Sequence, residues 1–542
     1  MKKFFTLVAF ALGALSIQAK DYTCPLTISM SGYDMPVGDV TVNVDEQGDG
    51  KYTMQLLNFE LGDDMPVGNI IVKDVEATKC GNTIMLNAQK AIRITAGDKK
   101  NADGTDKEWM GPGLQDVNII FKGELKGDNF KALLNIPVAG ALIVGVKLGE
   151  NADQICQLPN SGFENFHKAT YQKVSSDEPN GWHSFMSSTG SLSGSVSGAI
   201  HTFISTDVRK EDVNGDGVIN DEDQTDNKNC VKIVSTPVKV GNYVAASANG
   251  TITTGQLNAG SMIASDAKNN AFLNFENTAT DGNSDPFYAV LNNKPDAMKV
   301  WVKFHAGEGN KNPHATVSAL LTNGQNVQDP EKDDYKNNII ARANKSDIAS
   351  SDEWQQITIP FTYDNEDEMP KAALVTMSTC AVPSGGSKSE KDPDVLYVDD
   401  VEMVYNADFA KITMDGEDIT NQFDEEYGDY EIEDYAGKAV DLKNFDVEAV
   451  GAGAFVTKKL TVEDGTAYVT LTVTSNDLKT SVVRSITINN IATGIKNAQT
   501  VTLPNGVNAI YNLAGQQVSS MTSGNVYIVK TTDGKTKKVI KK

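Results

Sequence analysis

The feature that most constrains the fold of this chain is a succession of strand-like segments with little helical periodicity between them. Runs such as Asp39–Val44, Asn69–Val75, Asn118–Leu125 and Lys299–His305 are rich in β-branched and aromatic residues, and clusters of Gly, Asn and Asp separate them. Branched and aromatic side chains favour extended backbone, whereas Gly, Asn and Asp favour turns. We therefore expect an all-β protein built of barrels and sandwiches.

The first residues have the three-part layout of a secretory signal peptide. Lys2 and Lys3 precede an uncharged, largely apolar run from Phe4 to Ile17, and the small residue Ala19 precedes a polar stretch. The run is shorter than the roughly 20 apolar residues that a spanning helix needs. We expect residues 1–19 to be removed, and the mature chain, without a transmembrane segment, to pass through the periplasm and be secreted or displayed on the cell surface.

Charge and cysteine content narrow the class of protein further. The 542 residues allow several domains, and the formal net charge of -24 argues against nucleic acid as a partner. Five cysteines are few for a disulfide scaffold, although an exported protein could form pairs. Cys24 and Cys80 are the first pair to test because both fall in the first domain, and the odd count leaves at least one thiol unpaired.

The first domain, residues 20–152, contains an internal echo. The five residues Asp34–Gly38 return unchanged as Asp64–Gly68, and a weaker third copy is Asn135–Val138. An offset of 30 residues corresponds to about two strands with their turns, which is typical of an up-and-down barrel. Together with Phe59–Gly62 and Phe121–Asp128, these residues resemble the calycin-like domain of Bacteroidota, which implies a lipocalin-like β-barrel.

The second domain, residues 153–405, has the opening and closing strands of a jelly-roll sandwich. Its segments resemble the family called the putative carbohydrate metabolism domain of Bacteroidota, which implies a jelly-roll fold like that of carbohydrate-binding modules. The segments that carry the resemblance are Asn160–Glu164, Gly181-Trp182, Pro286–Tyr288, Lys299–Phe304, Glu353–Phe361 and Leu396–Tyr405.

Two smaller β-domains are expected after residue 405. Residues 406–492 contain strand signals and a strongly acidic stretch that reads as a solvated face, and a small sandwich is the default fold. Residues 493–542 contain Ile510–Val518, Gly524–Lys530 and a lysine-rich end. This tail resembles the C-terminal sorting domain of the type IX secretion pathway, which implies that the secretion machinery is a partner where the host has it. The sequence departs from the family pattern at one position, because Asn525 follows Gly524 where the family usually has isoleucine.

An insertion at residues 207–229 contains the spacing of a calcium loop. Oxygen side chains occupy loop positions 1, 3, 5, 9 and 12, glycine occupies position 6, and Val218 offers its carbonyl oxygen at position 7. That spacing wraps a loop around a hard cation that needs six or more oxygens. The expected Ca²⁺ ligands are Asp212, Asn214, Asp216, Val218, Asn220 and Asp223. The alternative is a hydrophilic insertion without an ion.

A second calcium site is implied by the jelly-roll resemblance. In similar modules, a carboxylate after the opening phenylalanine and one in the closing strand share a structural ion, which here points to Glu164 with Asp399 or Asp400. Ordinary surface carboxylates are the alternative reading of these residues.

Sugar recognition requires flat apolar faces flanked by polar groups. The candidates are Trp182, Tyr288, Trp301 and Tyr363, with His183 and His305 nearby. In a strand, Trp301, Lys303 and His305 share one face while Val300, Val302 and Phe304 share the other, so the first three should point outward. Each aromatic residue alone could equally be packing, and Trp354 is assigned to the core.

The sequence identifies no catalytic residue. It contains no His-Glu-x-x-His motif, no phosphate-binding Gly-rich loop with Lys, and no Cys/His spacing typical of zinc. We therefore expect an exported, non-catalytic protein with structural calcium that binds a glycan. Two alternatives stay open: a glycan-processing enzyme of the glycoside hydrolase type with its site in residues 153–405, and a structural or adhesive envelope protein.

Overall fold

A computed structural model describes most of the chain after the first 18 residues. The described ranges are 19–30, 32–61, 65–114, 116–139, 142–196, 201–210, 228–240, 243–276, 279–491, 507–511, 526–531 and 536–540. Within them the protein is all-β, as expected, and its helical elements are short. Among these residues no helix has the length and apolarity needed to cross a membrane. The expected signal peptide lies outside the described ranges, apart from Ala19.

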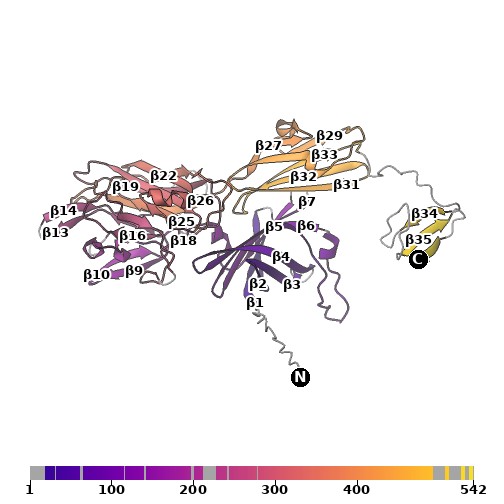
Figure 1. The fold of residues 1–542 in the computed structure, drawn as a ribbon, viewed down its shortest axis with the longest axis horizontal. Helices are drawn as coiled ribbons and strands as arrows, with labels where there is room; N and C mark the ends of the chain where they lie inside the picture. Colours follow the sequence, from indigo (N-terminus) through magenta and orange to yellow (C-terminus); the bar gives the residue numbers. More distant parts are fainter. Residues whose placement is uncertain are drawn as a thin grey trace, which may run out of the picture. The chain divides into compact units, whose positions relative to one another are not determined.

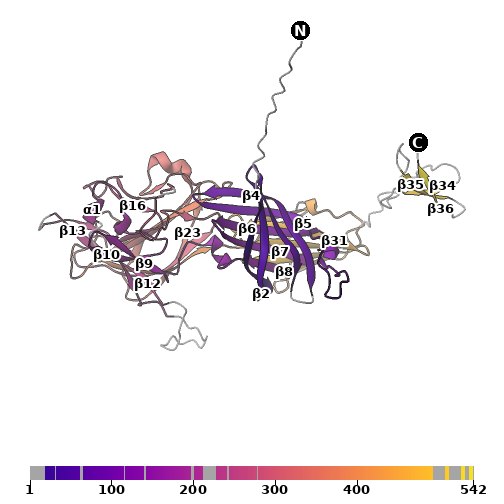
Figure 2. The same cartoon turned by 90° about the horizontal axis from the view of Figure 1, so that it is seen from below.

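The N-terminal strands close into an eight-stranded antiparallel barrel, which confirms the expected architecture (Figures 1 and 2). Each strand pairs with the next in sequence, and β1 also pairs with β8. The strands are β1 (Lys20–Met30), β2 (Tyr33–Gly48), β3 (Lys51–Glu60), β4 (Pro66–Cys80), β5 (Thr83–Arg93), β6 (Asp116–Lys126), β7 (Asn129–Ala139) and β8 (Leu142–Leu148).

The echoed segments are equivalent irregularities in alternate strands. In β2 the register against β1 shifts beside Gly38, and in β4 the register against β3 shifts beside Gly68. Both glycines have positive φ, 116° and 123°, a conformation in which a side chain is strained. The third copy also coincides with a shift, next to Pro137 in β7. The repeat therefore encodes the places where the barrel wall bends.

The barrel interior is a continuous apolar core. Alternate residues of the strands point inward, as Leu26 and Ile28 do in β1 and Val42 and Val44 do in β2. The expected Cys24–Cys80 disulfide is wrong, because Cys24 lies in this interior cluster while Cys80 lies in a separate buried cluster. All five cysteines are buried free thiols.

The following segment forms a sandwich of two antiparallel sheets. The five-stranded sheet has the order β11 (Thr202–Ser205), β12 (Cys230–Val234), β26 (Val395–Val404), β19 (Ala297–His305) and β23 (Gln355–Pro360). The six-stranded sheet contains β15 (Thr251–Thr253), β25 (Ala372–Ser378), β20 (His314–Thr322), β22 (Ile339–Ala349) and β24 (Thr362–Tyr363), and β18 (Ala289–Val290) pairs with β25.

One apolar core joins the two sheets. Val300, Val302 and Phe304 of β19 have no exposed surface and lie in the same cluster as Val317 of β20 and Val375 of β25. Burial of such side chains stabilises a fold by about 25 cal/mol per Å² of apolar surface removed from water. The sandwich predicted for this region is thus present, and the strand Lys299–His305 belongs to β19, which lies between β26 and β23 in the five-stranded sheet.

Shorter elements surround the sandwich. They are the hairpin β9 (Phe166–Tyr171) and β10 (Val174–Pro179), the hairpin β13 (Thr236–Val240) and β14 (Tyr243–Ala248), and a small sheet of β16 (Gln256–Ala259), β17 (Asn269–Phe272) and β21 (Gln328–Asp329). The helical elements of the described residues are η1 (Gly111–Leu114), η2 (Ala152–Cys156), η3 (Phe185–Ser187), α1 (Ser193–Val196), η4 (Asp333–Asn338), η5 (Thr420–Gln422) and η6 (Leu442–Asn444).

The C-terminal regions add three small sheets. Two of them have the orders β28 (Glu417–Asp418), β27 (Asp408–Met414), β30 (Phe445–Val450), and β29 (Asp429–Ile432), β33 (Ser481–Ile488), β32 (Thr466–Thr474), β31 (Phe455–Glu463). The third consists of β34 (Val507–Tyr511), β35 (Val526–Thr531) and β36 (Thr536–Ile540), around Ile510, Tyr527 and Val529. A small β-domain was expected over residues 493–542, and a sorting role for this tail stays a prediction.

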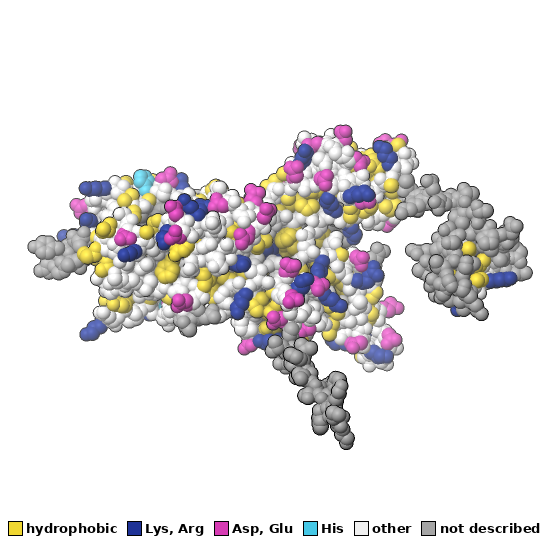
Figure 3. Space-filling view, viewed as in Figure 1, with side chains coloured by type: hydrophobic (Ala, Val, Ile, Leu, Met, Phe, Trp, Pro, Cys, Tyr) yellow, Lys and Arg dark blue, Asp and Glu magenta, His cyan; other side chains and the backbone are white. Residues whose placement is uncertain are grey.

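The acidic composition does not produce a single acidic patch on the face seen in Figure 3. Asp and Glu side chains lie among Lys and Arg side chains there, and small apolar patches separate them. Surface ion pairs occur among the described residues, such as Lys299 with Glu402. Pairs of this kind contribute little to stability.

Candidate ligand-binding face and buried histidine–carboxylate cluster

The predicted calcium loop cannot be placed. Its six expected ligands, Asp212, Asn214, Asp216, Val218, Asn220 and Asp223, all lie outside the described residues. The calcium loop therefore stays a prediction.

The carboxylates predicted for a second calcium have other partners among the described residues. The Glu164 carboxylate accepts the backbone N–H groups of Lys228 and Asn229 at 2.8 and 3.2 Å. The guanidinium of Arg209 binds the carboxylate of Asp400, and Asp399 accepts the N–H of Asp400 at 2.9 Å. The opening and closing segments do meet, as expected, since the N–H of Val401 donates to the Ser161 carbonyl at 2.9 Å. A shared ion at these residues stays a prediction.

Two of the aromatic residues expected at a ligand surface belong to the core instead. Trp182 has no exposed surface, its indole N–H donates to the Pro159 carbonyl at 2.9 Å, and its ring lies 5.1 Å from that of Phe163. Tyr288 is 7% exposed and packs against Phe275. Their expected role as sugar platforms is therefore wrong. An isolated Gly-Trp or Phe-Tyr motif does not reveal which side of its segment faces the core.

Trp301 and His305 lie where strand alternation places them. Trp301, Lys303 and His305 project from the outer face of β19, while their neighbours in the strand are fully buried. Lys303 is opposite Tyr397 of β26, and its ammonium lies 4.8 Å from that ring. The His305 imidazole contacts the exposed carboxylate of Asp392 at 2.8 Å.

Further rings and cations continue this outer face. Trp354, which was expected in the core, is half-buried and meets Tyr397 edge-on with a centroid separation of 6.4 Å. The Arg209 guanidinium lies 4.9 Å from the Trp301 ring. Tyr363 lies in β24 of the other sheet, and its hydroxyl donates to the Pro295 carbonyl at 2.8 Å. We call Trp301, Lys303, His305, Trp354 and Tyr397 the outer aromatic face.

A second constellation lies beside the β9–β10 hairpin and was not predicted from the sequence. The antiparallel register sets His167 of β9 directly opposite Glu178 of β10. The chain then turns, and His183 follows with a fully buried side chain. A distant loop supplies Asp281, whose side chain is 1% exposed. We call His167, Glu178, His183 and Asp281 the buried cluster.

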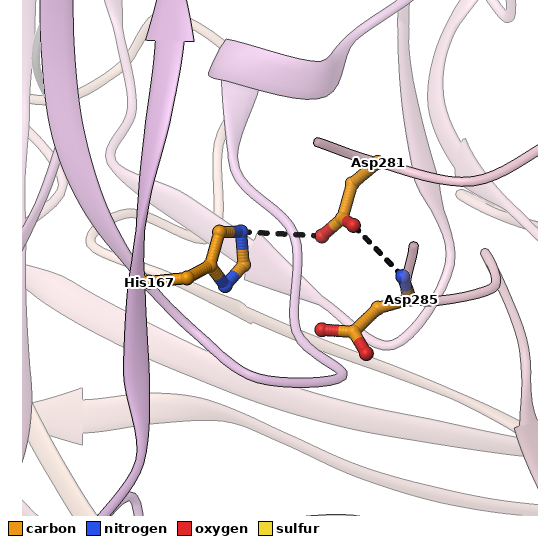
Figure 4. Close-up of side chains that lie close together, drawn as sticks. All are labelled: His167, Asp281 and Asp285. Carbon is orange, nitrogen blue, oxygen red and sulfur yellow. Dashed lines mark hydrogen bonds and ion pairs between the residues drawn. The ribbon is translucent and has the colours of Figure 1, made fainter. Parts of the chain in front are cut away.

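Close contacts link the four side chains of the buried cluster, and Asp281 is shared by two groups of possible metal ligands, one with Glu178 and His183 and the other with His167 and Asp285. The Asp281 Oδ2 atom lies 3.3 Å from His167 Nε2 and 3.3 Å from His183 Nδ1, and Glu178 Oε2 lies 3.7 Å from His167 Nε2. Figure 4 shows the His167 ring turned toward the Asp281 carboxylate, with Asp285 alongside. None of these four atoms has a hydrogen-bond partner, although all are buried.

Each member of the buried cluster is held through its other polar atom. The loop backbone fixes Asp281, since the N–H groups of Asn283 and Asp285 donate to Oδ1 at 2.8 and 2.9 Å. The N–H and hydroxyl groups of Ser184 donate to Glu178 Oε1. These hydrogen bonds therefore fix the two carboxylates with the other oxygen of each facing an imidazole nitrogen.

The imidazoles are oriented in the same way. His183 Nε2 lies 3.1 Å from the Pro286 carbonyl oxygen, and His167 Nδ1 lies 3.1 Å from Asn180 Oδ1. Both partners are acceptors, so these nitrogens carry the protons. In the neutral tautomers, His183 Nδ1 and His167 Nε2 are left with lone pairs that face carboxylate oxygens.

The electrostatics of the cluster reflect this crowding of charge. Burial tends to lower the pKa of His167, but contacts with Asp281, Asn180 and Glu178 outweigh it, and the pKa of His167 is raised. Burial raises the pKa of Glu178. For Asp281 burial acts upward, yet the two imidazoles and the Asp285 N–H hold the pKa of its carboxyl below its usual value. Paired perturbations of this kind are typical of functional sites.

Sequence reasoning missed the buried cluster because its members follow no motif spacing. His167 and Glu178 become neighbours only through the hairpin register, and Asp281 comes from a loop far along the chain. The available signal was weak: the chain has five histidines, and two of them lie in one short segment beside Glu178.

Comparisons with known proteins give a family match for the barrel and two matches to solved structures. Two solved structures resemble the chain, each with a TM-score of 0.32. One, a "putative glycoside hydrolase" from Bacteroides vulgatus ATCC 8482, is 16% identical and covers 45% of this chain and 96% of its own. The other, a "putative glycoside hydrolase" from Bacteroides thetaiotaomicron VPI-5482, is 12% identical and covers 67% and 99%. No curated protein matches. Residues 19–148 match the family model described as a Calycin-like beta-barrel domain, in agreement with the closed barrel β1–β8.

Proposed function

We propose that this protein is exported to the cell surface or secreted, and that it binds a glycan on the outer aromatic face without turning it over. The observation that carries the proposal is the position of Trp301. Its side chain lies on the outward face of β19, whereas the side chains of its neighbours Val300 and Val302 are fully buried. Trp354 and Tyr397 add two more rings on the same face. Carbohydrates are recognised by flat apolar faces bordered by polar groups, and Lys303 and His305 provide such a border.

The proposal includes the parts that were expected from the sequence. The N-terminal segment of the chain supports export, the tail supports recognition by type IX secretion machinery, and the loop at residues 212–223 supports structural calcium. The loop makes a specific prediction: Asp212→Ala with Asp216→Ala should reduce the rise in melting temperature that millimolar calcium produces. A response that is unchanged in the double variant would assign the calcium to other residues.

The binding proposal is tested on the intact protein and two matched variants. Wild type, Trp301→Ala and Tyr427→Ala are applied to the same glycan array, and each hit is titrated by calorimetry. Tyr427 is an exposed aromatic residue outside the sandwich, 75% exposed, so its removal controls for a general loss of aromatic surface. Trp301 is partly buried, so a ligand could cover roughly 50 Å² of its ring; this would contribute about 1.3 kcal/mol, and Trp301→Ala should weaken binding by about 8-fold or more.

Three outcomes separate the candidate functions. Binding that is lost in Trp301→Ala and kept in Tyr427→Ala supports the outer aromatic face. The appearance of new reducing ends when hits are incubated with wild type would identify a glycoside hydrolase instead. Binding to no glycan would leave the structural or adhesive envelope protein as the better account.

A further inference from the structure

We propose that the buried cluster is a four-coordinate site for a divalent transition metal, with Zn²⁺ as its ion. The ligands are His167 Nε2, Glu178 Oε2, His183 Nδ1 and Asp281 Oδ2. This site is separate from the calcium loop and from the outer aromatic face, and the proposal does not depend on the glycan proposal.

The first argument is the pattern of satisfied and unsatisfied atoms. Each ligand side chain has one polar atom hydrogen-bonded to a neighbour and one buried atom without a partner. Leaving a buried polar atom unpaired costs about 1–3 kcal/mol, so four such atoms in one place demand a partner. Each of the four atoms lies 3.3–3.7 Å from another of them, and a single cation bound between them would satisfy them all.

The second argument is the direction of the protons. The Pro286 carbonyl and Asn180 Oδ1 accept hydrogen bonds from the N–H groups at His183 Nε2 and His167 Nδ1. Metal-binding histidines commonly donate their other N–H in this way, which turns the free lone pair toward the ion. Without a cation, neutral imidazole lone pairs would face the Asp281 carboxylate at 3.3 Å, an arrangement of acceptor against acceptor.

The alternative without a metal is a pair of imidazolium–carboxylate hydrogen bonds. The geometry argues against it, because the contacts of His167 and His183 with Asp281 are within ion-pair distance but do not meet hydrogen-bond geometry. A metal ion needs no such proton, since it lies between the ligand atoms.

The distances suit a small tetrahedral ion. Zinc bonds to imidazole nitrogen and carboxylate oxygen are about 2.0–2.2 Å, so tetrahedral ligand atoms lie about 3.3–3.6 Å from one another. Asp281 Oδ2 lies 3.3 Å from both His167 Nε2 and His183 Nδ1, and Glu178 Oε2 lies 3.7 Å from His167 Nε2. Calcium takes six to eight oxygens at longer bonds, and imidazole is a ligand for zinc and related transition metals, so calcium fits poorly.

The expected role of the ion is structural. The side chains of Glu178 and His183 have no exposed surface, and that of His167 is 11% exposed, so four protein ligands enclose the centre. Closed four-ligand sites are structural, whereas catalytic zinc keeps a position for water. The ion would tie the β9–β10 hairpin and the segment after it to the Asp281 loop.

The intact protein tests this directly. After treatment with a chelator, the chain is titrated with ZnCl₂ in buffer with saturating calcium, and Co²⁺ is used as a spectroscopic substitute. We expect one equivalent of zinc and the intense visible absorption of tetrahedral cobalt. Glu178→Gln and His167→Gln, which preserve size, should each weaken zinc binding at least about 100-fold, because even loss of an outer partner costs 10–100-fold.

The controls keep the outcome decisive. His314→Ala removes an exposed histidine outside the cluster and should leave zinc affinity unchanged. Far-ultraviolet circular dichroism establishes that each variant is folded, and the cobalt spectrum of wild type requires no variant. The proposal is overturned if wild type binds no zinc, if its cobalt spectrum is octahedral, or if folded Glu178→Gln and His167→Gln bind zinc as wild type does.

Discussion

Replacing Trp182 tests whether this residue is part of the core or part of a ligand surface. In the structure its side chain is fully buried against Phe163 and donates to the Pro159 carbonyl. Truncation of a buried Trp to Ala costs about 3–5 kcal/mol, and the carbonyl left without its donor adds about 1 kcal/mol. The expected loss for Trp182→Ala is therefore about 4–6 kcal/mol, a large part of the stability of a domain.

Urea unfolding measured by tryptophan fluorescence is a suitable assay. Trp301 and Trp354 remain in the sandwich of the variant and report its transition. With an m-value of about 3 kcal/mol/M, the midpoint should fall by about 1.3–2 M. Trp182→Phe keeps a buried six-membered ring but loses the pyrrole part of the indole and the hydrogen bond, so it should lose about 1–3 kcal/mol, less than Trp182→Ala. Trp301→Ala, on the outer face, should lose less than Trp182→Phe.

One result would refute this reasoning. If Trp182→Ala unfolded at the same urea concentration as wild type while glycan binding fell, Trp182 would be a surface platform and its place in the core would be wrong. If Trp182→Ala does not accumulate as folded protein, Trp182→Phe is measured in its place, because its smaller loss of unfolding free energy leaves a measurable transition.

Three further predictions follow from single residues. Burial lowers the pKa of His201 to about 4, so as pH falls below about 6.5 the unfolded chain takes up a proton at this residue before the folded chain does. The free energy of unfolding should therefore fall by about 2–3 kcal/mol between pH 7 and pH 4.5. Urea unfolding of His201→Asn at these two pH values should show a smaller difference between the midpoints than wild type does. A Cβ at Gly68 would meet the Thr95 carbonyl oxygen at 2.2 Å, whereas one at Gly38 would meet nothing within 4 Å; both positions have positive φ, so Gly38→Ala should cost about 1–3 kcal/mol and Gly68→Ala clearly more, and equal melting temperatures would contradict the clash. All five cysteines are buried free thiols, so a thiol reagent should label none in the native protein and five in denaturant, and fewer than five would reveal a disulfide.

The barrel and the alternation of β19 were accessible from sequence because both rest on local, periodic signals. A strand repeats its facing direction every two residues, so Trp301 and Val302 could be assigned to opposite sides without knowledge of their neighbours. The echo of Asp34–Gly38 reported equivalent positions in two strands, and those positions are the bulged ones. A local rule was sufficient in each case.

The buried cluster and the burial of Trp182 were not accessible, because both depend on tertiary contacts. His167 meets Glu178 through the register of one hairpin, and Asp281 joins them only after the chain has passed through the strands β11 to β17. Trp182 stands in an irregular segment where no period indicates the inward side. Cys24 and Cys80 fall in one domain but in separate clusters, so proximity in sequence gave the wrong pairing.

The most direct test of the metal centre is diffraction from crystals of the zinc-loaded protein, recorded on both sides of the zinc absorption edge. The account predicts one anomalous peak, bounded by His167 Nε2, His183 Nδ1, Glu178 Oε2 and Asp281 Oδ2, at about 2.0–2.2 Å from each atom. Ordered density for these four side chains without an anomalous peak between them, or zinc bound only elsewhere on the chain, would contradict it.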